Sequence, residues 1–129
     1  MSIKRITPIT KHPVNDKTIV WCSYHDGQGF YSLVDGLETT DKINVTAYSL
    51  RDLMVTPELQ AKIRMWVWQN VCTQSPDELV KCCKSASPYY RIDLMNESVS
   101  DEHSKQFYTH MLNLCETMVE TNGTRKITF

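Results

Sequence analysis

The densest group of chemically reactive side chains in the sequence lies between positions 22 and 31. It combines a thiol, an imidazole, a carboxylate, an amide and two phenols. A cysteine beside a histidine base is the pair that a cysteine hydrolase uses, because the histidine takes the thiol proton and leaves a nucleophilic thiolate. The members of this group are Cys22, Tyr24, His25, Asp26, Gln28 and Tyr31.

The spacing of Cys22 and His25 disfavours such a pair in an extended chain. Strand residues rise ~3.3 Å each, so residues three positions apart lie ~10 Å apart, beyond hydrogen-bond reach. A small enzyme assembled around Cys22, His25 and Asp26 would need a sharp bend and a histidine from the stretch 101–121. We keep this enzyme as the alternative function, and we interpret the segment around Asp26 as a tight turn built for backbone reasons.

The remaining cysteines and histidines lack the spacing of metal ligands. Cys82 and Cys83 are adjacent, and no pair of cysteines is separated by two residues. His103 and His110 share a helix face, but at 1.5 Å per residue they lie ~10 Å apart along the axis. No glycine-rich loop that could hold a phosphate opens a helix. We therefore expect no metal and no cofactor.

A second group of candidate binding residues follows a proline, in the run 87–91, whose sequence is SPYYR. Tyrosine and arginine are enriched at binding hot spots because they combine a large contact area with polar reach. The alternation of Tyr90, Ile92 and Leu94 predicts a strand over 89–95. The candidate binding residues are Tyr89, Tyr90 and Arg91, together with Tyr24, His25, Asp26, Gln28 and Tyr31 of the first group.

The elements that must position these residues begin as strands. β-Branched and aromatic residues predict strands over 17–24 and 30–34, joined by a hairpin turn. Weaker signals predict an edge strand over 3–6, a third strand near 42–45 and a closing strand over 124–129.

Helical signals dominate the rest of the chain. Thr56 precedes a proline and predicts the start of a central helix over 57–72. A capping box that begins at Ser75 predicts a helix to about residue 85. Ser100 is the expected cap of a long C-terminal helix over 101–121, and a short helix is expected over 47–54.

The central helix carries two apolar stripes on opposite sides. Since each apolar face must be covered, we expect the sheet to cover one stripe and the C-terminal helix to cover the other. A homodimer through Met65 and Trp68 is the alternative cover of the second stripe. That second stripe consists of Ala61, Met65, Trp68 and Cys72.

Together these elements predict an α+β fold with a mostly antiparallel sheet of four to five strands and three to four helices. With 129 residues and no visible linker, the chain is expected to form a single compact α+β domain over 1–129.

Charge and composition narrow the function. A net charge of −1 gives no electrostatic reason for binding nucleic acid or an anionic membrane. Five cysteines cannot form a complete disulfide framework, and no signal-peptide core or membrane-spanning apolar run occurs, so we expect a cytoplasmic protein. Scarce alanine is typical of AT-rich genomes such as those of phages. The sequence therefore favours a small non-enzymatic protein-interaction module, such as a viral regulator or inhibitor that binds another protein.

Overall fold

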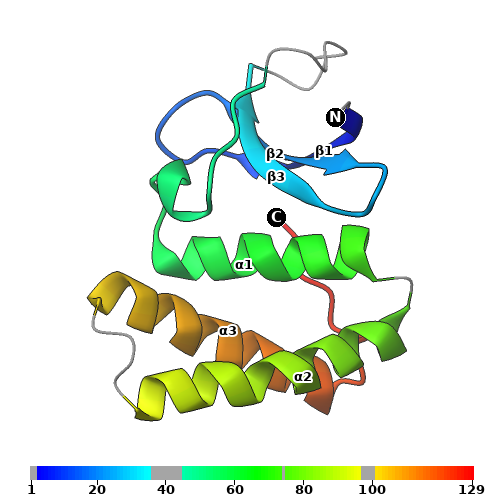
Figure 1. Cartoon of the computed structure of the whole chain (residues 1–129), viewed down its shortest axis with the longest axis vertical. Coiled ribbons are helices and arrows are strands. Elements are labelled where there is room, and N and C mark those ends of the chain that lie inside the picture. The colour runs from blue at the N-terminus through cyan, green and yellow to red at the C-terminus, as the bar shows by residue number, and fades with distance from the viewer. Residues whose placement is uncertain (1–2, 36–44, 74, 97–100) are drawn as a thin grey trace. The chain divides into compact units, whose positions relative to one another are not determined.

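The computed structural model describes residues 3–35, 45–73, 75–96 and 101–129. Residue contacts divide the chain into two compact units, Met1–Val55 with Phe129, and Thr56–Thr128. We call them the sheet unit and the helical unit. Along the chain, the elements are β1 (Ile3–Lys11), β2 (Thr18–Tyr24), β3 (Gly29–Val34), the 3-10 turn η1 (Arg51–Leu53), α1 (Pro57–Val67), the π-helical turn η2 (Trp68–Cys72), α2 (Pro76–Met95) and α3 (Glu102–Glu120) (Figure 1).

The sheet unit is built on an antiparallel sheet in the order β1-β2-β3. Cys22 pairs with Ile6 on one side and with Phe30 on the other. The predicted edge strand continues beyond residue 6 to Lys11. It includes Pro8, which an edge strand tolerates because, in the sheet of the described residues, β1 pairs with β2 alone.

A buried histidine fastens the loop after β1 to the end of η1. The Nδ1 atom of His12 accepts hydrogen bonds from the backbone N–H groups of Val14, at 3.1 Å, and Asn15, at 3.3 Å. Because Nδ1 accepts, the proton lies on Nε2, which donates to the carbonyl oxygen of Leu53 at 2.7 Å. The ring therefore joins two backbone segments far apart in sequence.

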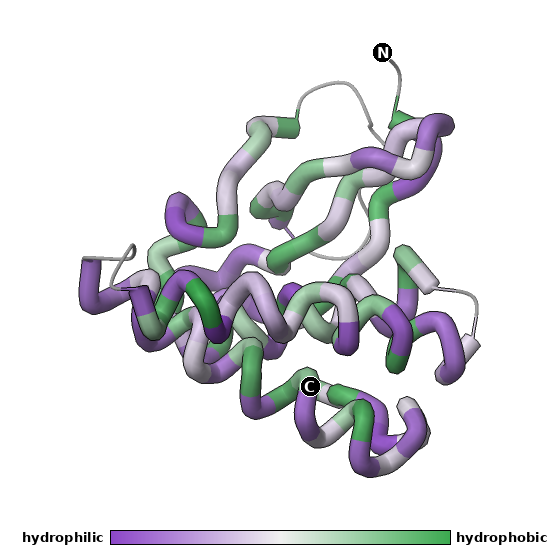
Figure 2. The backbone as a smooth tube through the Cα atoms, turned by 60° about the horizontal axis from the view of Figure 1, so that its bottom comes forward, coloured by the Kyte–Doolittle hydropathy of each residue, from purple (hydrophilic) through white to green (hydrophobic). Residues whose placement is uncertain are grey.

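In the helical unit, α3 packs against both α1 and α2 (Figure 1). Hydrophobic and hydrophilic residues alternate along these helices, as Figure 2 shows, so each helix has an apolar side to bury. The core that these sides form is rich in sulfur-containing side chains. Its buried members are Ala61, Met65, Leu79, Cys83, Met111, Cys115 and Met118.

The helices begin at capping side chains. Thr56 Oγ1 accepts from the backbone N–H of Leu59 at 3.2 Å, and Ser75 Oγ accepts from that of Glu78 at 3.3 Å. The cap of α3 is Asp101, one residue after the predicted Ser100. The predicted helix over 57–72 is helical throughout, but it changes from α to π geometry at Trp68.

The predicted count of four to five strands is wrong, since the sheet of the described residues has three strands. The predicted strand over 89–95 is the second half of α2, which continues through Pro88. The alternation there was misleading because Cys83, Tyr90 and Leu94 also recur at helical spacing, seven and four residues apart.

Two other predicted elements also differ, and one lies outside the described residues. Residues 124–129 form no strand, because the backbone of Ile127 pairs with a side chain instead. Gln69 Nε2 donates to the Ile127 carbonyl oxygen at 2.8 Å, and Gln69 Oε1 accepts from the Ile127 N–H at 2.9 Å. The short helix over 47–54 reduces to η1, since Tyr48 forms an antiparallel bridge with Tyr31. Residues 42–44 of the third predicted strand are not described.

Candidate functional site

The hairpin turn between β2 and β3 is held by its own backbone and by one carboxylate. The Tyr24 N–H donates to the Gln28 carbonyl oxygen at 2.8 Å. Asp26 Oδ1 accepts from the Gln28 N–H at 3.0 Å, and Gly27 takes a φ of 86°, which favours glycine. The Asp26 carboxylate therefore stabilises the turn, while the side chains of His25 and Gln28 are exposed at its tip.

Cys22 is unsuited to be a nucleophile. Its side chain is fully buried, and burial raises the pKa of the thiol to about 11. The thiol therefore stays protonated at neutral pH, while His25 is exposed at the tip of the turn. In the helical unit, His103 lies 2.7 Å from the side-chain amide of Gln60.

The aromatic residues of the hairpin serve the sheet unit itself. Tyr31 is buried and packs edge-to-face on Trp21, with ring centroids 4.9 Å apart. Tyr24 packs on Phe30 at 5.6 Å. Gly29 leaves room for Trp21, because a Cβ atom at position 29 would lie 2.7 Å from the indole ring. Among the hairpin candidates, the exposed side chains of His25 and Gln28 are the ones that take part in none of the contacts described above.

The second half of α2 exposes three large apolar side chains. Tyr89 is 71% exposed, Ile92 52% and Met95 76%. They lie three residues apart, so they form one stripe along the helix, which we call the α2 stripe. Sequence reasoning selected Tyr89 but missed Ile92 and Met95. Reading the segment as a helix instead of a strand would have placed all three together.

Tyr90 points the other way, into the helical unit. Its ring stacks on that of Tyr108 with centroids 5.1 Å apart, and it packs against the core. Burial raises the pKa of Tyr90, and the nearby Arg64 partly offsets the rise. Tyr90 thus stabilises the packing of α2 on α3 and contributes less to the surface than its neighbour Tyr89.

A groove of about 340 Å³ lies between α2 and α3. Its α2 wall carries Lys84 and Arg91, and its α3 wall carries Glu116 and Glu120. Arg91 Nη2 and Glu116 Oε1 approach to 3.7 Å across it, and both side chains are more than half exposed. The other lining residues are Ser87, Pro88 and Val119.

The groove and the α2 stripe form one continuous surface. Pro88 and Arg91 of the groove lie one helical turn from Ile92 and Met95 of the stripe. We call this surface the contact face. It joins large apolar side chains to charged walls of both signs, and protein interfaces likewise combine apolar with polar area.

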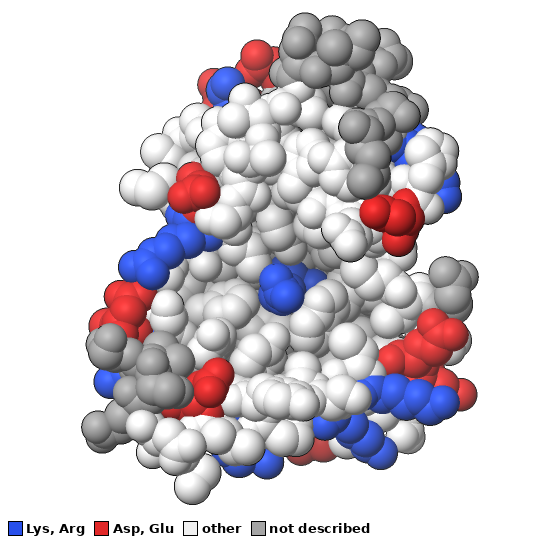
Figure 3. All heavy atoms as spheres, viewed as in Figure 1, with Lys and Arg blue, Asp and Glu red and all other residues white. Residues whose placement is uncertain are grey.

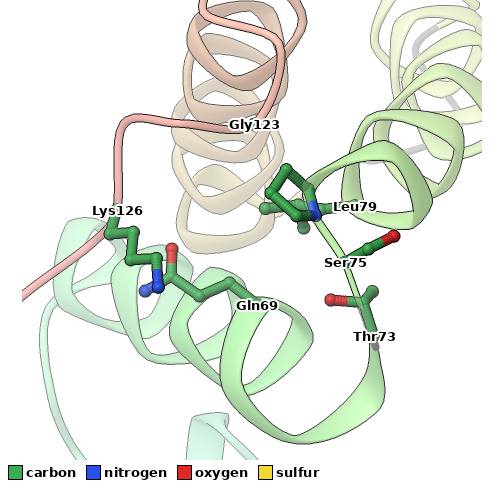
Figure 4. A pocket seen from close by; sticks show the side chains of 7 residues that line it. Gln69, Thr73, Ser75, Leu79, Gly123 and Lys126 are labelled. Atoms are coloured by element: carbon green, nitrogen blue, oxygen red, sulfur yellow. The ribbon is translucent and has the colours of Figure 1, made fainter.

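A smaller pocket of about 110 Å³ lies near the start of α2 (Figure 4). Gln69 and Lys126 line one side of it, and Thr73 and Ser75 lie across from them. Ser75 already caps α2, and Gln69 already binds the backbone of Ile127. Two of its polar side chains therefore stabilise the fold, and the space suits a few water molecules.

The thiols of the helical core are also enclosed. Cys83 and Cys115 are fully buried, and a hydrogen bond between them, together with burial, raises the pKa of Cys83. Over the described part of the chain, no three histidine, cysteine or acidic side chains form a group that could hold a metal ion.

The second apolar stripe of the central helix, which was the predicted alternative dimer contact, lies largely within the helical core. Met65 is fully buried in the core, and Trp68 packs partly buried against it. A dimer contact through Met65 and Trp68 would therefore involve only the exposed part of the Trp68 indole, because Met65 is not accessible.

The length and apolarity of the described helices and the distribution of charge bear on whether the chain has a membrane-spanning or strongly charged surface. Within the described ranges, no helix combines the length and apolar character needed to cross a bilayer. On the face drawn in Figure 3, basic and acidic side chains are interspersed. Comparison of the chain with protein-family models, with curated proteins and with solved structures finds no match.

Proposed function

We propose that this chain is a small non-enzymatic protein-interaction module, which acts as a regulator or inhibitor by binding another protein chain through the contact face. The observation that carries the proposal is the α2 stripe, where Tyr89, Ile92 and Met95 are all more than half exposed on one side of one helix. Large apolar side chains are buried where a fold offers them a place, so a row of exposed ones favours a surface that a partner covers.

The charged groove supports the same proposal. Binding energy in protein interfaces concentrates in a few large anchors such as tyrosine and arginine, surrounded by polar groups that exclude water. The contact face offers Tyr89 and Arg91 as such anchors. Both belong to the binding residues chosen from the sequence, whereas Tyr24, Tyr31 and Tyr90 have packing roles within their units.

The enzyme alternative receives less support. Its nucleophile, Cys22, is fully buried and keeps its proton at neutral pH. All five cysteines are free thiols, which fits the cytoplasmic, reducing location that we propose for the protein.

Site-specific photocrosslinking in the native host tests the proposed function. A photoreactive phenylalanine analogue replaces Ile92 in one variant and Val14 in the control, since Val14 is 86% exposed but belongs to the sheet unit. We expect a discrete crosslinked protein from position 92 and none from position 14. Equal crosslinking at both positions, or none at position 92, would contradict the proposal.

A further inference from the structure

We propose that the partner on the contact face is a second copy of this chain, related to the first by a twofold axis that runs along the groove. This inference rests on the proposed function of the contact face and narrows its partner to an identical chain.

The charges of the groove lie in two rows of opposite sign. Lys84 and Arg91 are seven residues apart on α2, which is about two helical turns, so they face the same way. Glu116 and Glu120 are four residues apart on α3 and form the opposite wall. The groove therefore has a basic side and a shorter acidic side, since the two basic side chains are seven residues apart and the two acidic ones are four apart.

This pattern is complementary to itself. A twofold axis along the groove brings the α2 wall of one copy opposite the α3 wall of the other, and the same contact occurs twice. Each basic row then meets an acidic row. An axis across the groove would instead place like charges together, which is unfavourable. The charges thus select one orientation of the two copies.

The apolar parts of the contact face fit the same arrangement. Pro88 and Val119 also line the groove, and the α2 stripe continues beside it. When α2 and α3 of one copy lie on α2 and α3 of the other, four helices enclose these side chains, as in a helix bundle. A partner with an unrelated surface would need one sign of charge on each wall by coincidence, whereas a second copy supplies both signs from the same residues.

Arg91 and Glu116 would exchange partners on assembly. In the single chain they approach each other at 3.7 Å while more than half exposed to water. An exposed pair of this kind is weak, so its loss costs little. In the dimer, each side chain meets its opposite from the second copy in a site from which water is partly excluded.

The test is sedimentation equilibrium of the purified chain, with charge reversals at the two walls. We expect a dimer for the natural chain, and a dissociation constant raised at least ~10-fold by Arg91→Glu and by Glu116→Arg alone. An equimolar mixture of these two variants should regain the natural affinity, since every altered side chain then faces the opposite charge in the mixed dimer. Arg125→Glu, an exposed charge outside the contact face, is the matched control and should leave the equilibrium unchanged.

Three results would overturn the inference: a monomer at all concentrations, a dimer insensitive to both reversals, or a mixture no tighter than the single variants. Because Arg91 and Glu116 are more than half exposed, both variants should fold, and circular dichroism checks this. If the chain is monomeric but position 92 still crosslinks to a different protein, the homodimer fails and the proposed function stands. If position 92 crosslinks to nothing, both fail.

Discussion

The β2–β3 hairpin and the second half of α2 contain similar side chains, but the fold uses them in different ways. In the hairpin, Tyr31 is covered by Trp21 and Asp26 binds the turn backbone. In α2, Tyr89 and Met95 remain exposed. Residue type alone therefore does not identify a binding surface. What separates the two regions is whether a partner for each side chain already exists within its own unit.

The same contrast exists between adjacent residues. Tyr89 and Tyr90 are chemically identical, but one is 71% exposed and the other stacks on Tyr108. On a helix, consecutive side chains differ by about 100° in direction, so neighbours commonly serve different partners. Matched substitutions can test this difference between side chains that pack within their own unit and side chains that remain exposed.

The largest expected effect comes from two methionines. Met65→Ala should lower the free energy of unfolding by about 3 kcal/mol, because it leaves a cavity in the helical core, whereas Met95→Ala should change it by less than about 0.5 kcal/mol. Met65 is fully buried and Met95 is 76% exposed. Urea unfolding followed by circular dichroism measures both. Equal losses would mean that the assignment of core and surface in this unit is wrong.

Two glycines of the hairpin provide the next comparison. Gly29→Ala should cost about 2 kcal/mol by overpacking, because the new methyl group would meet the Trp21 ring and the Cys22 carbonyl oxygen. Gly27→Ala has nothing within 4 Å, so its cost should come from the positive φ alone, about 1 kcal/mol. Thermal unfolding and tryptophan fluorescence measure the difference. A Gly27 variant less stable than the Gly29 variant would refute the close approach at Trp21.

The hairpin and the helix starts were predictable from sequence because short-range signals determine them. Asp26 and Gly27 specify a turn wherever two strand-forming segments flank them. Thr56 and Ser75 each precede a proline and cap a helix through a backbone N–H three residues on. These interactions involve neighbours in the chain, so their residue types are sufficient evidence.

The strand count and most of the candidate site depend on contacts that the sequence pattern does not specify. Period-two and helical spacing agree for Tyr90 and Leu94, and Pro88 obscured the continuation of α2. The strand assignment placed Ile92 on the same face as Tyr90 and Leu94, opposite Tyr89, whereas in the helix Ile92 lies beside Tyr89. The structural role of His12 was not predicted, because its hydrogen-bond partner, the Leu53 carbonyl oxygen, lies 41 positions away in the sequence.

The C-terminal segment offers a smaller test of a contact that replaces a strand. Gln69→Ala removes both hydrogen bonds to the backbone of Ile127, and should lower the free energy of unfolding by about 1 kcal/mol. The more direct measurement is amide hydrogen exchange at Ile127, which should become faster. Asn70→Ala, one residue along, is the control, since the Asn70 side chain bonds to the Trp66 carbonyl oxygen within its own helix. Faster exchange in both variants would indicate general loosening instead.

The smallest expected change in stability is also the most informative about function. Tyr89→Ser should alter the free energy of unfolding by less than about 0.5 kcal/mol, because the ring is mostly exposed, whereas Tyr90→Ser should cost about 2 kcal/mol through lost packing on Tyr108.

Binding should show the reverse order at concentrations where both variants are folded. If the α2 stripe is covered by a partner, Tyr89→Ser weakens that association, since it removes an exposed aromatic anchor. Tyr90→Ser affects it less, because its ring already contacts Tyr108 within the chain. Sedimentation and crosslinking from position 92 measure the association, and chemical denaturation measures the stability. A Tyr89 variant that binds as well as the natural chain would show that its exposure serves no contact, and would remove the main difference between α2 and the hairpin.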